Sequence, residues 1–309
     1  MTSHDETDDP IVGRLLSPAL RCAHGHTPEN VALVQLFMAA SCANDASRAL
    51  DAAIREITSD PRATSGGLTR LERMRELWDQ TPDAFANVKA VTRTLDHPNA
   101  RDPHPAPATW GTIFDAAASV SHEASVALYS LGRADLLRAA SDEIVEWMRS
   151  RNLLAPRACV LDIGCGSGRM TEVLAPHVKA VIGTDVSMQM LQAAHERCAD
   201  LPNTHFVRTS GHGLSVFKDA SVDLACAVDV FPYFVMSGVA QRHFSEAARV
   251  LRPGGHLIIL NFAYDSDPVA ERGKLRHLAQ NSGLSLQYSA SREFTLWDGT
   301  CFLMQNFGA

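Results

Sequence analysis

The 309-residue chain has 46% hydrophobic residues, 20% charged residues and a formal net charge of −7. This composition excludes low-complexity disorder over most of the length, and the size corresponds to about two domains. Residues 1–150 hold 14 Lys and Arg against 21 Asp and Glu, whereas residues 151–309 hold 14 against 14. Neither half has an excess of basic residues, which disfavours nucleic acid as a partner.

The sequence lacks the features of a membrane or secreted protein. No run reaches the roughly 18–20 apolar residues of a membrane span, and the acidic N-terminus has no signal-peptide pattern. Seven dispersed cysteines without a CxxC spacing suit a reducing compartment. We therefore expect a cytoplasmic protein without membrane contact. His24 and His26 have no third ligand nearby, so we expect no metal site.

The first half is predicted to be entirely helical after a disordered stretch of about ten residues. Apolar residues at helical spacing indicate helices starting near Thr27 and over 45–57, 68–78 and 83–95, with a break at Ser65–Gly67. Four prolines between residues 96 and 109 indicate a linker. Two further helices follow, at about 110–130 and 133–150. We expect three parts: a helical region over 1–102, a helical lid segment or linker over 103–150, and a domain over 151–309.

The second half alternates short apolar strands with amphipathic helices. Strands are expected at about 158–164, 178–184, 204–208, 222–228 and 256–262, and helices at about 168–176, 187–199 and 239–251. This alternation is typical of an α/β fold with a doubly wound, mostly parallel sheet. The chain should reverse at Pro253-Gly254-Gly255. Two runs near the C-terminus, without a helix between them, predict an antiparallel pair at the sheet edge.

The strongest motif is VLDIGCGSG, in which Asp162 precedes Gly164, Gly166 and Gly168. A glycine-rich turn after a buried strand brings backbone close to a ligand at the carboxyl edge of an α/β sheet. A dinucleotide fingerprint is G-x-G-x-x-G, and Arg169 occupies the place of its third glycine. A carboxylate before the turn suits a cation better than a pyrophosphate. The spacing therefore disfavours an NAD-dependent oxidoreductase.

Asp185 ends the second predicted strand, where a carboxylate can accept both hydroxyls of a ribose. Together with SVDLACAVDVFPYF and EAARVLRPGGHLIILNF, these motifs resemble, over about residues 158–307, the class I S-adenosylmethionine-dependent methyltransferases. The resemblance implies S-adenosyl-L-methionine as cofactor, without a metal. It also implies a set of cofactor-binding residues, namely Asp162, Gly164, Cys165, Gly166, Gly168, Asp185, Val186, Met190, Gly211, His212, Ala227, Val228 and Asp229. Since relatives carry an Asp near Gly211 and this chain does not, adenine recognition would use backbone groups or Ser210.

No general base stands out in the sequence. Asp229 either acts on the substrate or orients the following loop, and His122 and His212 are either bases or ordinary helix and loop histidines. The aromatic residues Tyr129, Phe231, Tyr233 and Phe234 either line an acceptor site or pack the core. Displacement at a sulfonium carbon releases a neutral leaving group, so positioning can supply most of the catalysis.

We expect a small-molecule methyltransferase acting on nitrogen or oxygen, with residues 110–130 covering the acceptor side of the sheet. The absence of an N/D-P-P-Y/F/W tetrapeptide after the fourth strand disfavours amino-group methylation of bases or glutamine. The alternative is a methyltransferase whose helical region docks a protein or RNA, and a non-catalytic binder is a further one. The helices of 27–95 are expected to serve a dimer contact.

Overall fold

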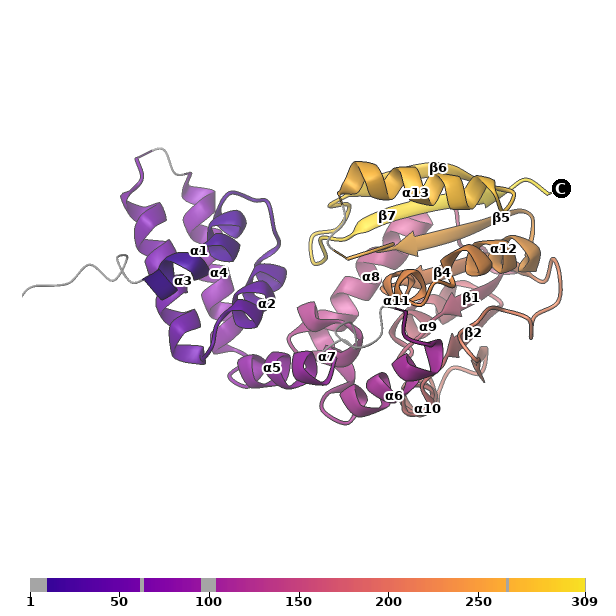
Figure 1. Cartoon of the computed structure of the whole chain (residues 1–309), viewed down its shortest axis with the longest axis horizontal. Helices are drawn as coiled ribbons and strands as arrows, with labels where there is room; N and C mark the ends of the chain where they lie inside the picture. The colour runs from indigo at the N-terminus through magenta and orange to yellow at the C-terminus, as the bar shows by residue number, and fades with distance from the viewer. Residues whose placement is uncertain (1–9, 62–63, 96–103, 265–266, 309) are drawn as a thin grey trace, which may run out of the picture.

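The computed structural model describes residues 10–61, 64–95, 104–264 and 267–308. A helical bundle lies at one end of the molecule and a sheet flanked by helices at the other, with α5–α7 running between them (Figure 1). The expected disordered N-terminus, residues 1–9, and most of the expected linker, 96–103, fall outside the described residues. No helix within the described ranges is long and apolar enough to cross a membrane.

The N-terminal bundle contains four helices, and α2 packs against the other three. The helices are α1 (Pro10–Ala23), α2 (Glu29–Ala39), α3 (Ala43–Ser59) and α4 (Ser65–Asp79), followed by α5 (Ala84–Thr94). α2 is buried on nearly all sides because α1, α3 and α4 surround it, which explains its almost uniformly apolar sequence. The sequence did not predict α1. Ser65–Gly67 begins α4 instead of breaking the chain. Gly67 allows close packing against the end of α1, since a Cβ on it would lie 3.1 Å from the carbonyl oxygen of Ala23.

The expected helix over 110–130 is divided into three pieces, α6 (Pro107–Ala118), α7 (His122–Val126) and the single 3-10 turn η3 (Leu128–Ser130). The division occurs because the Ser121 side chain accepts a hydrogen bond from the Ala124 N–H and caps a new helix. A long helix, α8 (Ala134–Ser150), then leads to the sheet domain as predicted.

Seven strands form one sheet in the order β3-β2-β1-β4-β5-β7-β6. The strands are β1 (Cys159–Ile163), β2 (Ala180–Asp185), β3 (Thr204–Arg208), β4 (Val222–Val228), β5 (Leu251–Leu260), β6 (Leu284–Ser291) and β7 (Thr300–Asn306). The first five are parallel, and β7 lies antiparallel between β5 and β6. The prediction of a doubly wound, mostly parallel sheet is therefore confirmed. Within β5 the pairing passes directly from Leu251 to His256, so 252–255 form the expected irregularity.

Helices cover both faces of the sheet. They are α9 (Arg169–Leu174) with the short turn η4 (Ala175–His177), α10 (Met188–Arg197), α11 (Phe231–Met236), α12 (Ala240–Val250) and α13 (Pro268–Gln280). α11 and α13 were not predicted. β1 and β4 are almost fully buried, as expected for central strands covered on both faces. The carboxyl ends of β1, β2, β4 and β5 therefore meet at one edge, where the glycine-rich turn lies.

Candidate active site

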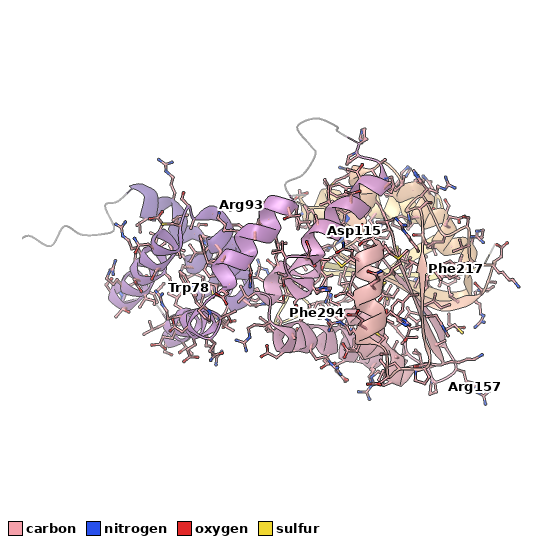
Figure 2. The ribbon with its side chains drawn as sticks, turned by 90° about the horizontal axis from the view of Figure 1, so that it is seen from below. Trp78, Arg93, Asp115, Arg157, Phe217 and Phe294 are labelled. Atoms are coloured by element: carbon pink, nitrogen blue, oxygen red, sulfur yellow. The ribbon has the colours of Figure 1, made fainter. Side chains whose placement is uncertain are left out.

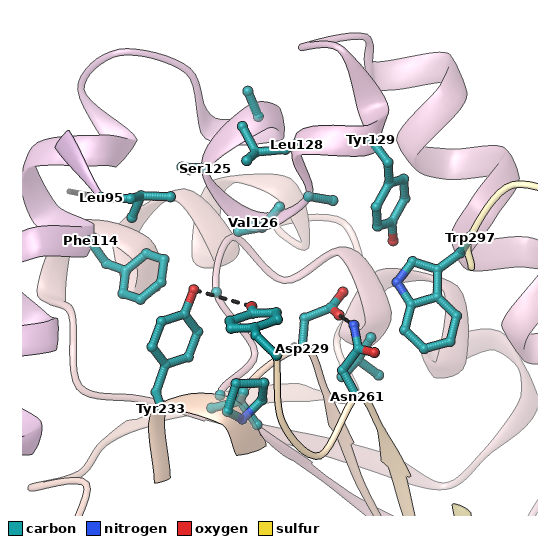
Figure 3. Close-up of a pocket in the computed structure, with 18 of the residues that line it drawn as sticks. Leu95, Phe114, Ser125, Val126, Leu128, Tyr129, Asp229, Tyr233, Asn261 and Trp297 are labelled. Atoms are coloured by element: carbon teal, nitrogen blue, oxygen red, sulfur yellow. Dashed lines mark hydrogen bonds between the residues drawn. The ribbon is translucent and has the colours of Figure 1, made fainter. Parts of the chain in front are cut away.

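A cavity of about 780 Å³ opens at the carboxyl edge of the sheet. Its walls come from the strand ends, from α6, α7 and η3, and from the N-terminal helices α2 and α5 (Figure 3). Residues 110–130 thus lie at this edge, on the side where the lid segment was expected. The N-terminal helices also line the cavity, through Val31, Val34, Gln35, Met38, Thr92 and Leu95.

The glycine-rich turn presents backbone to the cavity. Gly164 and Gly166 have φ values of +67° and +53°, which side-chain-bearing residues rarely adopt. The Gly166 N–H donates to Oδ2 of Asp185 over 3.0 Å, and the Ser187 N–H donates to Oδ1 over 2.8 Å. Each carboxylate oxygen keeps a second lone pair, so Asp185 can still accept two ligand hydroxyls.

Asp162 is a buried carboxylate at the end of β1. Its Oδ2 accepts a hydrogen bond of 2.7 Å from the Thr171 hydroxyl, and the thiol of Cys226 lies 3.8 Å from Oδ1. Burial raises the pKa of Asp162 to about 6, against the opposing effects of Thr171 and Arg169. A cationic ligand beside it would favour the ionised form.

Two residues at the ends of β4 and β5 adopt left-handed backbone conformations, Asp229 with φ +59° and Asn261 with φ +61°. Their side chains meet, because the Asn261 amide donates to Oδ1 of Asp229 over 2.6 Å (Figure 3). Oδ2 of Asp229 pairs with the buried guanidinium of Arg169 at 3.2 Å. Such strain costs roughly 1–3 kcal/mol per residue and tends to gather at functional sites. Both oxygens of Asp229 are engaged within the protein, so the residue anchors this part of the wall, and burial raises its pKa.

Tyr129 and Trp297 complete the polar end of the cavity. Figure 3 shows the Tyr129 hydroxyl directed into the cavity, with the Trp297 ring beside it. The Tyr129 hydroxyl is buried and has no hydrogen-bond partner among the described residues. Asn30 on α2 fixes this corner, since its amide donates to the carbonyls of Tyr129 (3.0 Å) and Leu296 (2.9 Å).

A second, smaller cavity of about 60 Å³ adjoins the first through shared wall residues that include Phe114 and Asp185. His243 lies in its wall and stacks on Phe234 with ring centroids 3.6 Å apart. Nδ1 of His243 lies 3.1 Å from the Val239 carbonyl oxygen, which can only accept, so Nδ1 carries the proton. Burial lowers the pKa of His243 to about 4, and Nε2 remains a hydrogen-bond acceptor.

The helices over the cavities are attached to α10. Asp115 on α6 accepts hydrogen bonds from the Ser187 hydroxyl and the Gln189 N–H at the start of α10, beside which it lies in Figure 2. Glu123 on α7 pairs with Arg197 at the end of α10, at 3.4 Å.

The structure brings together most of the residues expected to bind the cofactor and acceptor. The large cavity is lined by Asp162, Gly164, Cys165, Gly166, Asp185, Met190, Val228, Asp229, Tyr129 and Tyr233, and the small one by Val186, Gly211 and Phe234 as well. Among the described residues, no group of three or more His, Cys, Asp or Glu could hold a metal.

Five of the expected residues line neither cavity. His122 and His212 are exposed, so the structure does not support either as a base. Phe231 is part of the apolar core with Phe244, and the alternative of core packing is the correct one for it. Gly168 instead allows close packing on α10, because a Cβ there would lie 2.9 Å from that of Ala194. Ala227 is buried within β4.

No role was predicted from the sequence for Asn261, Trp297, Asp298 or His243, and Arg169 was considered only as the residue in place of a third glycine. Asn261 directly follows the apolar run of β5, and this position at the end of a strand was the one feature of the sequence that could have indicated a place in the site. Trp297 and Asp298 lie in the connection between β6 and β7, and His243 on a helix, where no local pattern marks them.

Residues 161–259 match the family model of the methyltransferase domain. With this match, the strand order and the glycine-rich turn after β1 define a class I S-adenosylmethionine-dependent methyltransferase domain in the second half of the chain. The residues present fit the cofactor of the class, because backbone and the Asp185 carboxylate are available for a ribose and the wall carries four carboxylates against one guanidinium.

A demethylmenaquinone methyltransferase of Tropheryma whipplei is 37% identical over 107 residues, which are 34% of this chain and 42% of that protein. An uncharacterized 37.1 kDa protein in transposon TN4556 of Streptomyces fradiae is 30% identical over 230 residues, 71% of this chain and 62% of that protein. The second similarity is longer than the sheet domain and so extends into the helical region. The chain spans about two fifths of the length of the first relative.

Among solved structures, phosphoethanolamine N-methyltransferase 1 of Haemonchus contortus aligns with a TM-score of 0.52 at 20% identity, covering 65% of this chain and 49% of that one. The [4+2]-cyclase SpnF aligns with a TM-score of 0.50 at 15% identity, covering 66% of this chain and 97% of that one. These similarities concern the fold.

Proposed function

We propose that the protein transfers a methyl group from S-adenosylmethionine to nitrogen or oxygen of a small-molecule acceptor, mainly by positioning. This proposal depends on the observation that a site suited to the cofactor and a second site suited to an acceptor lie in one cavity. Gly164, Gly166 and Asp185 form one part of its wall, and Tyr129, Asp229 and Asn261 form another. The bound cofactor supplies an electrophilic methyl group on a sulfonium.

The residues of the chain would then have distinct roles. Asp185 accepts the ribose hydroxyls, Asp162 lies near the methionyl amino group, and the Gly164–Gly166 backbone packs on the cofactor. His243 is the acceptor for the adenine amino group, a role that the sequence left to Ser210 or backbone. Asp229, held by Arg169 and Asn261, keeps the wall of the acceptor site rigid, which favours a productive geometry.

The lining of the cavity supports a small acceptor. Helices α2, α5, α6 and α7 contribute to its walls, and an RNA segment would need a basic lining. Arg169 is the one basic residue among the described lining residues, and Asp229 neutralises it. The curated demethylmenaquinone methyltransferase relatives, which by name act on a small molecule, also support this choice.

Calorimetry with S-adenosylmethionine, S-adenosylhomocysteine and NAD⁺ tests the proposal. We expect micromolar binding of the first two at one shared site and no heat with NAD⁺. Transfer is then followed by mass spectrometry with a trideuteromethyl-labelled cofactor. Binding of NAD⁺ without either sulfur compound would overturn the proposal.

A further inference from the structure

We infer that the methyl acceptor is an uncharged, largely apolar molecule whose single hydrogen-bonding head group meets the Tyr129 hydroxyl. This inference rests on the proposed function and deepens it by naming the chemical class of the acceptor. The relevant part of the cavity is its polar corner, formed by Tyr129, Asp229, Asn261 and Trp297, together with the apolar arm that leads away from it.

The order of strands separates the acceptor from the cofactor. Asp185 ends β2 and the glycine-rich turn follows β1, whereas Asp229 follows β4 and Asn261 follows β5. Neighbouring strands lie about 4.8 Å apart, so the four positions extend roughly 14 Å along the edge of the sheet. A cofactor held over β2 and β1 leaves the polar corner over β4 and β5 for a second ligand.

The charges around the cavity disfavour an anionic acceptor. Its described wall contains Asp162, Asp185, Asp229 and Asp298 against Arg169 alone. The Arg169 guanidinium is 95% buried and already paired with Asp229. A carboxylate or phosphate on the acceptor would lose its hydration without gaining an unpaired cation, which is costly in a buried site.

The Tyr129 hydroxyl is an unpaired polar group in the cavity wall and points to a ligand. The residue is 92% buried, and the hydroxyl has no hydrogen-bond partner among the described residues although it is directed into the cavity. The Arg169 guanidinium lies near it, 5.8 Å from the ring centroid, and opposes the effect of burial on its pKa. Burial raises the pKa of Tyr129, so the group keeps its proton and can donate it in a hydrogen bond. A buried hydroxyl without a partner is destabilising, and an acceptor oxygen or nitrogen would satisfy it.

The remaining wall is largely apolar and aromatic. Away from the polar corner it includes Val34, Met38, Leu95, Phe114, Tyr233 and Met236, together with the polar side chains of Gln35, Thr92 and Ser125. Phe114 packs edge-on against Tyr233 with ring centroids 5.1 Å apart, which gives a preformed aromatic surface. At about 780 Å³, the cavity falls in the range of sites that hold drug-sized ligands.

Matched probes with one aromatic body test the head group. With the full-length protein saturated with S-adenosylhomocysteine, we expect 2-naphthol to bind and 2-naphthoate to bind at least 30-fold more weakly. A series of 4-alkylphenols should gain about threefold to fourfold in affinity per added CH₂ until the arm is filled. Equal binding of naphthol and naphthoate, or affinity independent of chain length, would overturn the inference.

Tyr129→Phe tests the hydroxyl itself. We expect 2-naphthol to bind about threefold to tenfold more weakly, with S-adenosylhomocysteine affinity unchanged. The melting temperature should stay the same or rise, because the variant removes an unpaired buried group. The control is Tyr288→Phe, whose lost hydroxyl donates to Glu293 outside the cavity; it should lower the melting temperature and leave naphthol binding unchanged.

Other outcomes separate the two proposals. If S-adenosylhomocysteine does not bind the wild-type protein, the proposed function fails. If it binds, and Tyr129→Phe weakens S-adenosylhomocysteine but not naphthol, the hydroxyl serves the cofactor and the present inference is wrong.

Discussion

The Asn30 side chain donates a hydrogen bond to the backbone carbonyl of Tyr129, 99 residues further along the chain. The same amide bonds to the carbonyl of Leu296, so one buried residue on α2 connects the lid segment to the connection between β6 and β7. The N-terminal helices are therefore part of the cavity wall. Their expected role in a dimer contact stays a prediction, whereas residues of α2 line the cavity beside the polar corner.

Asn30→Ala should destabilise the protein by about 2 kcal/mol, because it removes two buried hydrogen bonds and leaves two carbonyls unpaired. It should also raise the KM for the acceptor while the affinity for S-adenosylhomocysteine changes less than twofold. Asn203→Ala is a matched control, since the Asn203 amide also donates to two carbonyls, those of Ala175 and Val178, outside the cavity. Equal KM effects in both variants would contradict the role of Asn30.

Asp185→Ala should weaken binding of S-adenosylmethionine about 100-fold, through loss of hydrogen bonds from ribose hydroxyls to a charged acceptor. Calorimetry measures this directly. Asp223→Ala removes a carboxylate at the opposite end of the sheet, where it accepts from the Cys159 N–H, and should leave cofactor affinity unchanged. An unaltered dissociation constant for Asp185→Ala would locate the cofactor elsewhere.

Gly166→Ala should weaken cofactor binding at least tenfold while the protein stays folded. The new Cβ would lie 2.7 Å from Cγ1 of Val126 on α7, at a backbone φ of +53°. Adding Val126→Ala should recover part of the affinity, because it removes the atom that clashes. Gly254→Ala is the control, since its φ is +83° but no atom lies within 4 Å, so only backbone strain is added.

The raised pKa of the Asp162 carboxyl group predicts that cofactor binding depends on pH. The pKa of this carboxyl group is raised from its ordinary value of 3.8 to about 6 in the folded protein, so the folded state binds more protons between about pH 4 and 6. This group's contribution to stability therefore decreases as pH rises through that interval. A cationic cofactor selects the ionised carboxylate, so affinity should be about tenfold weaker at pH 5 than at pH 7. In Asp162→Asn this dependence should disappear, as calorimetry across the range would reveal.

His243→Phe keeps the ring stacked on Phe234 but removes the Nε2 acceptor. We expect about threefold to tenfold weaker binding of S-adenosylhomocysteine, the effect of one hydrogen bond. The wild-type protein should prefer S-adenosylhomocysteine over S-inosylhomocysteine, which lacks the amino group, and the variant should lose this preference. A preference that survives in the variant would show that another group contacts adenine.

Some elements followed directly from the order of residues. The apolar run of β1, the glycines after it and Asp185 at the end of β2 are patterns within short stretches of sequence. The spacing of apolar residues in the helices that alternate with the strands was visible in the same way. α1 was not predicted, although one of its faces is apolar. α6 and α7 were predicted as one helix because a single hydrogen bond, from the Ala124 N–H to the Ser121 side chain, marks the start of α7.

The sequence by itself determined the class of fold, the cofactor and the turn that approaches it, because the alternation of strands and helices and the motifs at the strand ends are visible in short stretches of the chain. Only the tertiary structure decided which aromatic residues pack in the hydrophobic core and which line the cavity. Phe231 and Tyr233 are two positions apart on α11, yet one packs in the core and the other lines the cavity. The polar corner likewise brings together Tyr129, Asp229 and Trp297, and Asn30 supports it, so that four distant segments of the chain meet there. Such a site depends on how helices and strands pack, and no local pattern records that packing.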